Sequence, residues 1–239
     1  MARKSNQINL DCQFCSARSG SHFSDLGTEE LSILSSHKSC VGYKKGQTLF
    51  YEGTRPMGLF CINKGKVKVY KMGSNGKEQI LFISQPGDFL GYRSLLSEEF
   101  YGASATVIEP AAICFIPKTD FLTILNANPS FFSKLMKAVC HELGVMEEKL
   151  AQIAQKSVRE RLATTILMLK ETYGMEGEGS DTIDIMLSRE DLANIVGTAT
   201  ETVIRLLSEF KSDGLIALEG RKIKVLDDSG LIHEADFYS

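Results

Sequence analysis

Two charged side chains, Glu201 and Arg205, stand four residues apart in a segment with the spacing of a short amphipathic helix. Residues four apart lie on the same face of a helix, so the carboxylate and the guanidinium project side by side. An arginine can donate two hydrogen bonds to O6 and N7 of guanine, and a glutamate can accept one from the N4 amine of cytosine. The pair therefore predicts a helix that reads base edges in the major groove of DNA.

The segments around this pair predict a helix-turn-helix unit. Residues 188–191 have the pattern of a capping box that opens a first helix, although aspartate replaces the usual glutamate at its end. Gly197 suits the left-handed residue that terminates such a helix. Residues 198–201 form a second capping box, and the helix that they open is expected to end at Gly214. The link between the two helices is short, as helix-turn-helix geometry requires.

A hairpin, or wing, is predicted after the second helix, because residues 215–225 alternate around a Glu219-Gly220 turn. Arg221 and Lys222 at its tip are expected to hold phosphate. The alternative is an ordinary small α+β unit, but the wing and the Glu/Arg stripe favour DNA binding. The expected DNA contacts are Ser188, Arg189, Thr198, Thr200, Glu201, Arg205, Arg221 and Lys222.

Composition is that of a globular protein, with 43% hydrophobic and 24% charged residues over 239 positions. The net charge is −3, and residues 157–226 are acidic overall. Non-specific affinity for DNA depends on neutralising phosphates, so we expect modest, salt-dependent and site-selective binding. No apolar run is long enough to span a membrane and the N-terminus lacks a signal-peptide pattern, which predicts a cytoplasmic protein. No phosphate loop, HExxH pair or GxSxG elbow occurs, so an enzyme is not expected.

The pattern along the chain predicts four parts: an N-terminal arm over 1–22, a β-roll sensor domain over 23–128, a dimerisation helix over 129–156 and a winged helix-turn-helix domain over 157–239. A short helix is expected at 23–39, and a second helix after the dimerisation helix at 158–173. Short alternating segments between glycine turns indicate a sandwich or barrel. The expected strands are 48–52, 58–62, 66–70 and 78–83.

Apolar residues between 132 and 153 follow a strict 4-3 spacing over about three heptads, which predicts a helix that pairs with its own copy. A long helix buried within one subunit is the alternative. Dimerisation agrees with the DNA interpretation, since twofold proteins read inverted repeats. The predicted seam is Phe132, Met136, Val139, Leu143, Met146, Leu150 and Ile153.

This order of domains resembles the CRP/FNR family of bacterial transcription regulators, most specifically in residues 58–96 and 192–210. The resemblance implies an α+β fold with an N-terminal cyclic-nucleotide-binding-like β-roll, a long dimerisation helix and a C-terminal winged helix-turn-helix. It implies a homodimer that reads an inverted repeat with TGA-like half-sites through Glu201 and Arg205, with RNA polymerase as a protein partner. Thr200 and Ile204 depart from the cyclic-AMP and FNR branches, which leaves the flanking bases open.

The cyclic-AMP branch clamps its ligand with a glycine–glutamate pair and an arginine–serine pair, which align here with Gly91-Tyr92 and Tyr101-Gly102. The charged residues that would make the strongest bonds to the nucleotide are missing, which argues against cyclic AMP. Arg93 could form a different anion site, or a surface ion pair. Another small molecule in the same roll stays open, with Gly91, Tyr92, Arg93, Ser94, Tyr101 and Gly102 as its expected neighbours.

The FNR branch holds an iron–sulfur cluster on four cysteines, and Cys12, Cys15 and Cys114 match three of them. Ser21 occupies the remaining place, and serine is a poor substitute for a thiolate. Cys40 could complete the set only if the arm folds back differently, and His22 is a further candidate. An iron–sulfur cluster is therefore not expected, and no cofactor is assigned.

Without a secretory context, six cysteines do not indicate a disulfide framework. A metal or redox site using Cys12, Cys15 and Cys114 and a set of buried, unreactive thiols both remain open. So does a ligand-binding module that controls a protein partner without DNA.

Overall fold

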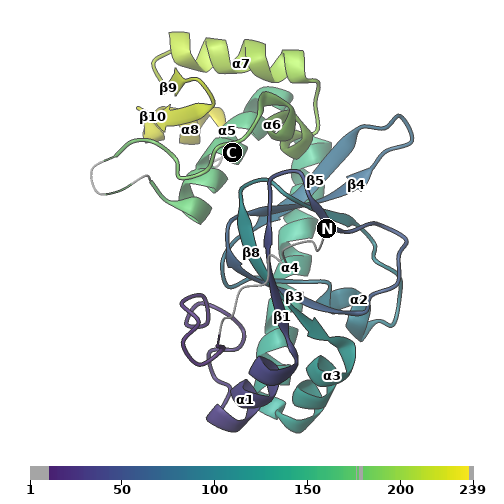
Figure 1. Cartoon of the computed structure of the whole chain (residues 1–239). Coiled ribbons are helices and arrows are strands. Elements are labelled where there is room, and N and C mark those ends of the chain that lie inside the picture. The colour runs from purple at the N-terminus through teal and green to yellow at the C-terminus, as the bar shows by residue number, and fades with distance from the viewer. Residues whose placement is uncertain (1–10, 176, 178–179, 237–239) are drawn as a thin grey trace, which may run out of the picture. The chain divides into compact units, whose positions relative to one another are not determined.

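The computed structural model describes residues 11–175, 177 and 180–236 (Figure 1). The chain divides into two compact units, Met1–Leu143 and Gly144–Ser239, and the boundary falls inside the helix α4 (Pro129–Gln155). None of the helices in the described residues is long and apolar enough to cross a membrane.

Two antiparallel four-stranded sheets build the β-roll of the first unit. One sheet has the order β1-β8-β3-β6, formed by Ser39–Tyr43, Ala111–Pro117, Gly58–Lys64 and Phe89–Leu90. The other has the order β2-β7-β4-β5, formed by Thr48–Phe50, Ser104–Val107, Val67–Met72 and Glu78–Ser84. Three of the four predicted strands begin at their predicted residue and the fourth one residue later, which confirms the sequence pattern.

The first sheet separates two apolar clusters because successive residues of a strand point to opposite faces. Phe60 and Ile62 of β3 point into the roll, where they meet residues of the other sheet. Leu59 of β3 and Ile116 of β8 point outward, into a cluster covered by helices. Those helices are α1 (Thr28–His37), α2 (Tyr92–Leu96), α3 (Lys118–Ala127) and the start of α4. Figure 1 shows α1 and α3 side by side next to this sheet.

The N-terminal arm differs from the loose segment expected over residues 1–22. Residues 1–10 lie outside the described part, but residues 11–22 form consecutive turns that pack on the roll. The Cys12 amide donates to Ser35 Oγ at 2.9 Å, and Ser21 and Phe23 are buried. Helix α1 is shorter than the predicted 23–39, because Phe23 reaches the apolar cluster from a turn.

Helix α4 has two apolar faces. Phe131 and Leu135 are buried against the roll. Of the predicted seam, Phe132 and Leu143 are exposed, at 47% and 59%, whereas Val139 packs partly against the roll. The exposed apolar residues further along the helix are Val145, Leu150 and Ile153.

The second unit combines helices with a two-stranded hairpin. Helix α5 (Val158–Tyr173) matches its predicted bounds, and a capping box between Ser157 and Glu160 opens it. The remaining elements are α6 (Arg189–Val196), α7 (Thr200–Ser212), β9 (Ile216–Glu219), β10 (Lys222–Val225) and α8 (Asp228–Glu234).

Candidate functional site

Helix α7 presents one polar and one apolar face, and its apolar face fixes its orientation. Val203, Leu206, Leu207 and Phe210 are buried, while Glu201 and Arg205 are exposed one turn apart on the opposite side. Figure 1 shows α7 along the outer edge of its unit. The predicted pair of base-reading side chains is therefore on an accessible helix face.

A shared carboxylate sets the position of the Arg205 side chain. Arg205 Nη1 donates to Glu209 Oε1 at 2.5 Å, and Arg159 Nη1 of α5 donates to the other oxygen, Oε2, at 3.0 Å. Arg159 also binds Asp213 and lies 4.7 Å from the centre of the Phe210 ring. These contacts fasten α7 to α5 and hold the guanidinium of Arg205 beside the helix, one turn from Glu201.

Helix α6 begins and ends as its sequence predicts. Ser188 is the N-cap, and its Oγ accepts from the Asp191 amide at 2.9 Å. Gly197 has a left-handed backbone with φ of 75°, which glycine adopts without the steric cost of a Cβ atom. The tight turn that follows delivers the chain to α7 after only three residues.

The capping box predicted at residues 198–201 is wrong. Ala199 is the N-cap of α7 and offers no side-chain acceptor, while Thr198 belongs to the preceding turn, where its amide donates to Ala193 O at 3.1 Å. The C-terminal turn of α6 requires both Gly197 and Thr198, which moves the start of α7 by one residue. Thr200 is the first residue of α7 and is partly exposed.

The wing is confirmed as an antiparallel hairpin in which Glu219 pairs with Lys222. Its turn is Gly220-Arg221, one residue later than predicted, so the exposed Arg221 lies at the tip. Arg189 Nη2 donates to Gly220 O at 2.9 Å, which fixes the wing to the first turn of α6, and burial lowers the pKa of this guanidinium. Arg189 therefore holds the wing in place.

The residues expected around an effector do not form one pocket. Tyr101 is 5% exposed, its ring stacks on Phe50 with 3.9 Å between centroids, and burial raises its pKa to about 12. A Cβ atom placed on Gly91 would lie 3.1 Å from this ring, so the tyrosine fills the space beside Gly91. Gly102 has no atom within 4 Å of its Cβ direction, and Ser94 Oγ donates to Phe100 O.

Tyr92 lies on the other side of the first sheet from Tyr101, in the helix-covered cluster. Its hydroxyl donates to Glu142 of α4, and burial together with this carboxylate raises the pKa of the phenol. Arg93 Nε is 3.8 Å from the same carboxylate, and its guanidinium lies over the Phe82 ring. Both residues thus contact α4 or β5, and neither faces the interior of the roll.

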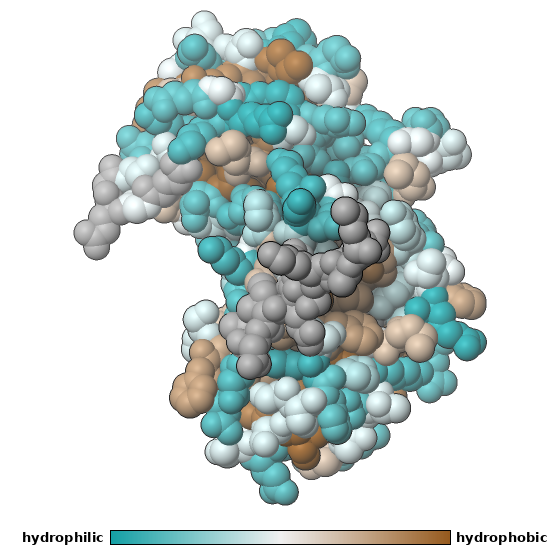
Figure 2. Space-filling view, in the orientation of Figure 1, coloured by the Kyte–Doolittle hydropathy of each residue, from teal (hydrophilic) through white to brown (hydrophobic). Residues whose placement is uncertain are grey.

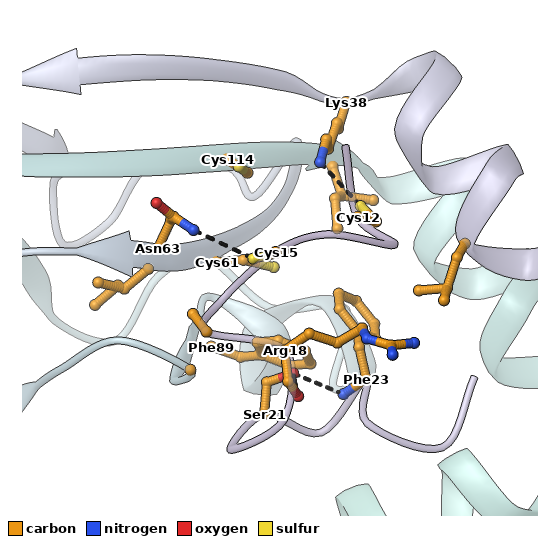
Figure 3. A pocket seen from close by; sticks show the side chains of 15 residues that line it. Cys12, Cys15, Arg18, Ser21, Phe23, Lys38, Cys61, Asn63, Phe89 and Cys114 are labelled. Carbon is orange, nitrogen blue, oxygen red and sulfur yellow. Dashed lines mark hydrogen bonds between the residues drawn. The ribbon is translucent and has the colours of Figure 1, made fainter. Parts of the chain in front are cut away.

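A second candidate site is a half-open cavity between the arm and the first sheet (Figure 3). Cys12, Cys15 and Arg18 line it from the arm, and Cys61 and Cys114 from the sheet. Lys38 Nζ donates to Cys12 Sγ at 2.9 Å, and Asn63 Nδ2 donates to Cys15 Sγ at 3.2 Å (Figure 3).

Cys40 and Cys114 form a disulfide, which corrects the expectation that the cysteines would be thiols or ligands. The two residues face each other on β1 and β8 with 4.0 Å between their Cα atoms. Cys61 on β3 faces Cys114 from the other side, so three cysteines form a row across three strands. Pairing between distant strands creates this row, and the sequence alone gives no signal for the part played by Cys61, Lys38 or Asn63.

The four-thiolate site of the FNR branch does not fit this arrangement. The sulfur of Cys114 is bonded to Cys40, and the Ser21 hydroxyl donates to Arg18 O at 2.9 Å. Across residues 11–175, 177 and 180–236, no group of three or more His, Cys, Asp or Glu residues is placed to hold a metal ion. Burial and the nearby Cys12 and Cys15 sulfurs raise the pKa of the Cys61 thiol.

Both units match families of known proteins. The family model of the cyclic nucleotide-binding domain matches residues 40–128, and that of the Crp-like helix-turn-helix domain matches residues 160–234. The transcriptional activator protein FnrA of Stutzerimonas stutzeri is 29% identical over 190 residues, which are 79% of this chain and 77% of that protein. The transcriptional activator protein anr of Pseudomonas aeruginosa is 28% identical over 77% of this chain and 75% of its own length.

Solved structures show the same fold. FixK2 from Bradyrhizobium japonicum superposes with a TM-score of 0.75 at 23% identity, covering 84% of this chain and 98% of that one. A β-roll followed by a winged helix-turn-helix defines a DNA-binding transcription regulator with a sensing domain. This chain belongs to the CRP/FNR family of transcription regulators.

Proposed function

We propose that this protein is a homodimer that reads an inverted repeat with TGA-like half-sites. The observation that carries the proposal is the exposed Glu201 and Arg205 pair on α7, whose opposite face is buried. Arginine is suited to the guanine of such a half-site and glutamate to the cytosine paired with it. Arg221 at the tip of the wing would contact the phosphate backbone. A cytoplasmic location would follow from this role.

The dimer would form along α4. Phe132, Leu143 and Leu150 are exposed on this helix although they follow a heptad spacing, and such a seam is stabilised when a second helix covers it. Two copies related by a twofold axis would present two α7 helices to successive major grooves. RNA polymerase would be the protein partner of the DNA-bound dimer.

A sensed signal would control this binding. The roll beside Gly91 is filled by Tyr101, which supports a signal other than cyclic AMP. The cysteine-lined cavity favours redox-responsive control as the second candidate, with Cys12, Cys15 and Cys114 among its residues. A small-molecule effector of another chemistry would need to displace Tyr101 from its stacked position.

Fluorescence anisotropy with the full-length protein tests the proposal. One labelled duplex carries two inverted TGA half-sites, and a matched duplex carries the same bases in scrambled order. We expect the scrambled duplex to bind at least about 10-fold more weakly, since each lost base contact costs roughly 1–3 kcal/mol. Both affinities should fall steeply with salt.

Light scattering on the complex should give two chains per duplex. Equal affinity for both duplexes would contradict the proposal and would favour a ligand-binding module that acts on a protein partner. One chain per duplex would contradict the dimer alone.

A further inference from the structure

Five of the six cysteines gather at one place in the first unit, outside the interior of the roll. Cys40, Cys114 and Cys61 form the row across β1, β8 and β3. Cys12 and Cys15 face this row from the arm, and both line the same cavity as Cys61 and Cys114 (Figure 3). The sixth, Cys140, is exposed on α4.

Exposure separates four of these cysteines into two pairs. Cys40 and Cys114 are buried, at 3% and 6%, so an external thiol has little access to their disulfide. Cys12 and Cys15 are partly exposed, and they have the Cys-x-x-Cys spacing at which two thiols readily close a disulfide. Thiols or disulfides in solution can therefore react with Cys12 and Cys15. The buried Cys40–Cys114 disulfide can react only through a neighbouring cysteine.

Cys12 is the better placed nucleophile of the cavity. The Lys38 ammonium donates to its sulfur, and a cation beside a partly exposed cysteine is the setting in which thiolates attack disulfides. The Cys12 amide donates to Ser35 Oγ, which keeps this part of the arm against α1. Cys61 is the poorer nucleophile, because burial raises the pKa of its thiol.

We propose that the Cys12–Cys15 dithiol reduces the Cys40–Cys114 disulfide by internal thiol–disulfide exchange. Cys12 first loses its proton to water, and the resulting thiolate attacks Cys114 Sγ. The bond between Cys114 and Cys40 breaks, and Cys40 leaves as a thiolate that takes a proton from water. Cys15 then loses its proton to water and attacks Cys12 Sγ, which forms the Cys12–Cys15 disulfide and releases Cys114 as a thiolate. After Cys114 is protonated, two electrons and two protons have passed from the arm to the sheet.

The reverse reaction stores an oxidising signal in the buried disulfide. A low-molecular-weight disulfide would oxidise the partly exposed Cys12 and Cys15, and the exchange would pass that oxidation to Cys40 and Cys114. A dithiol in solution would reverse it. Strand β8 leads directly into α3 at Lys118 and then into α4, so closing or opening this disulfide acts on the strand from which the dimerisation helix is reached. Only this last step rests on the proposed function.

Trapping of the mixed disulfide tests the exchange in the full-length protein. Wild type, Cys12→Ser, Cys15→Ser and the control Cys140→Ser are treated with dithiothreitol, quenched with acid, alkylated and digested for mass spectrometry. In Cys15→Ser the second step is blocked, so the peptide that joins Cys12 to Cys114 should accumulate. In Cys12→Ser this peptide should be lost and Cys40–Cys114 should stay closed under conditions that open it in wild type. Cys140→Ser should behave as wild type.

Three results would overturn the proposal. The first is opening of Cys40–Cys114 in Cys12→Ser at the wild-type rate, and the second is absence of the joined peptide from Cys15→Ser. The third is stoichiometric iron and sulfide in anaerobically purified protein, with the arm cysteines protected from alkylation. None of these results concerns DNA affinity, so failure here would leave the proposed function standing.

Discussion

In the second unit, Glu201 and Arg205 stand on the exposed face of a helix whose other face is buried. In the first unit, the residues that a ligand would meet are themselves part of the core, and Tyr101 stacks on Phe50 beside Gly91. Figure 2 shows a mostly hydrophilic described surface on the face in view, with apolar groups in small patches. Glu201 and Arg205 are therefore exposed, with Arg205 paired to Glu209 of its own helix, whereas the side chains inside the roll pack against one another.

This difference suggests where each unit carries its specificity. An exposed helix face can exchange water for base edges with little rearrangement, so its affinity is set by the side chains present. A filled roll can respond only if something inside it moves or reacts. The cysteines beside the first sheet, for which we propose disulfide exchange, offer such a change without an open cavity inside the roll.

The largest expected effect on stability comes from removing the Tyr101 ring from the interior of the roll. Tyr101→Ala removes a ring that is 5% exposed, and should lower the free energy of unfolding by about 3–5 kcal/mol, as for other buried aromatic residues. Tyr51, at 61% exposed, is the matched control, and Tyr51→Ala should change stability by less than about 0.5 kcal/mol. Urea unfolding of both variants measures the difference. Equal, small losses of unfolding free energy in the two variants would mean that the roll is loosely filled, and would contradict the contrast drawn between the two units.

A smaller effect is expected at the turn before α7, the helix that we propose reads DNA. Gly197→Ala places a Cβ on a residue with φ of 75°, which should cost about 1–2 kcal/mol of stability. Gly144 lies in α4 with no atom within 4 Å of its Cβ direction, and Gly144→Ala should be stabilising by up to about 1 kcal/mol. Thermal unfolding of the two variants should therefore shift in opposite directions. A shift in the same direction would show that the turn is not held as described.

The sequence predicted local structure better than contacts between distant segments. The bounds of α5, the cap at Ser188 and the end of α6 at Gly197 depend on neighbouring residues, and the structure agrees with each. The capping box predicted for α7 is wrong, because Thr198 belongs to the turn that ends α6 and is not available as the N-cap of α7. The helical period alone was enough to predict that Glu201 and Arg205 share an exposed face.

The contacts within the β-roll unit depend on which strands pair and in which register, and no local sequence pattern predicts this pairing. The pairing of Cys40 with Cys114 follows from β1 lying beside β8, although 74 residues separate them in the chain. The separation of Tyr92 from Tyr101 follows from the sheet that lies between them. The hydrogen bond from Lys38 to Cys12 forms because the arm folds against α1, and no sequence pattern predicts that fold.

We propose that Arg205 reads the guanine of a TGA-like half-site, and a thermodynamic cycle would measure this contact. Anisotropy would compare wild type with Arg205→Ala on the TGA duplex and on a duplex with adenine in place of that guanine in both half-sites. We predict that Arg205→Ala weakens binding to the TGA duplex by about 10-fold, or 1.4 kcal/mol, and leaves binding to the adenine duplex nearly unchanged. The same loss on both duplexes would contradict base reading by Arg205 and assign it to the phosphate backbone.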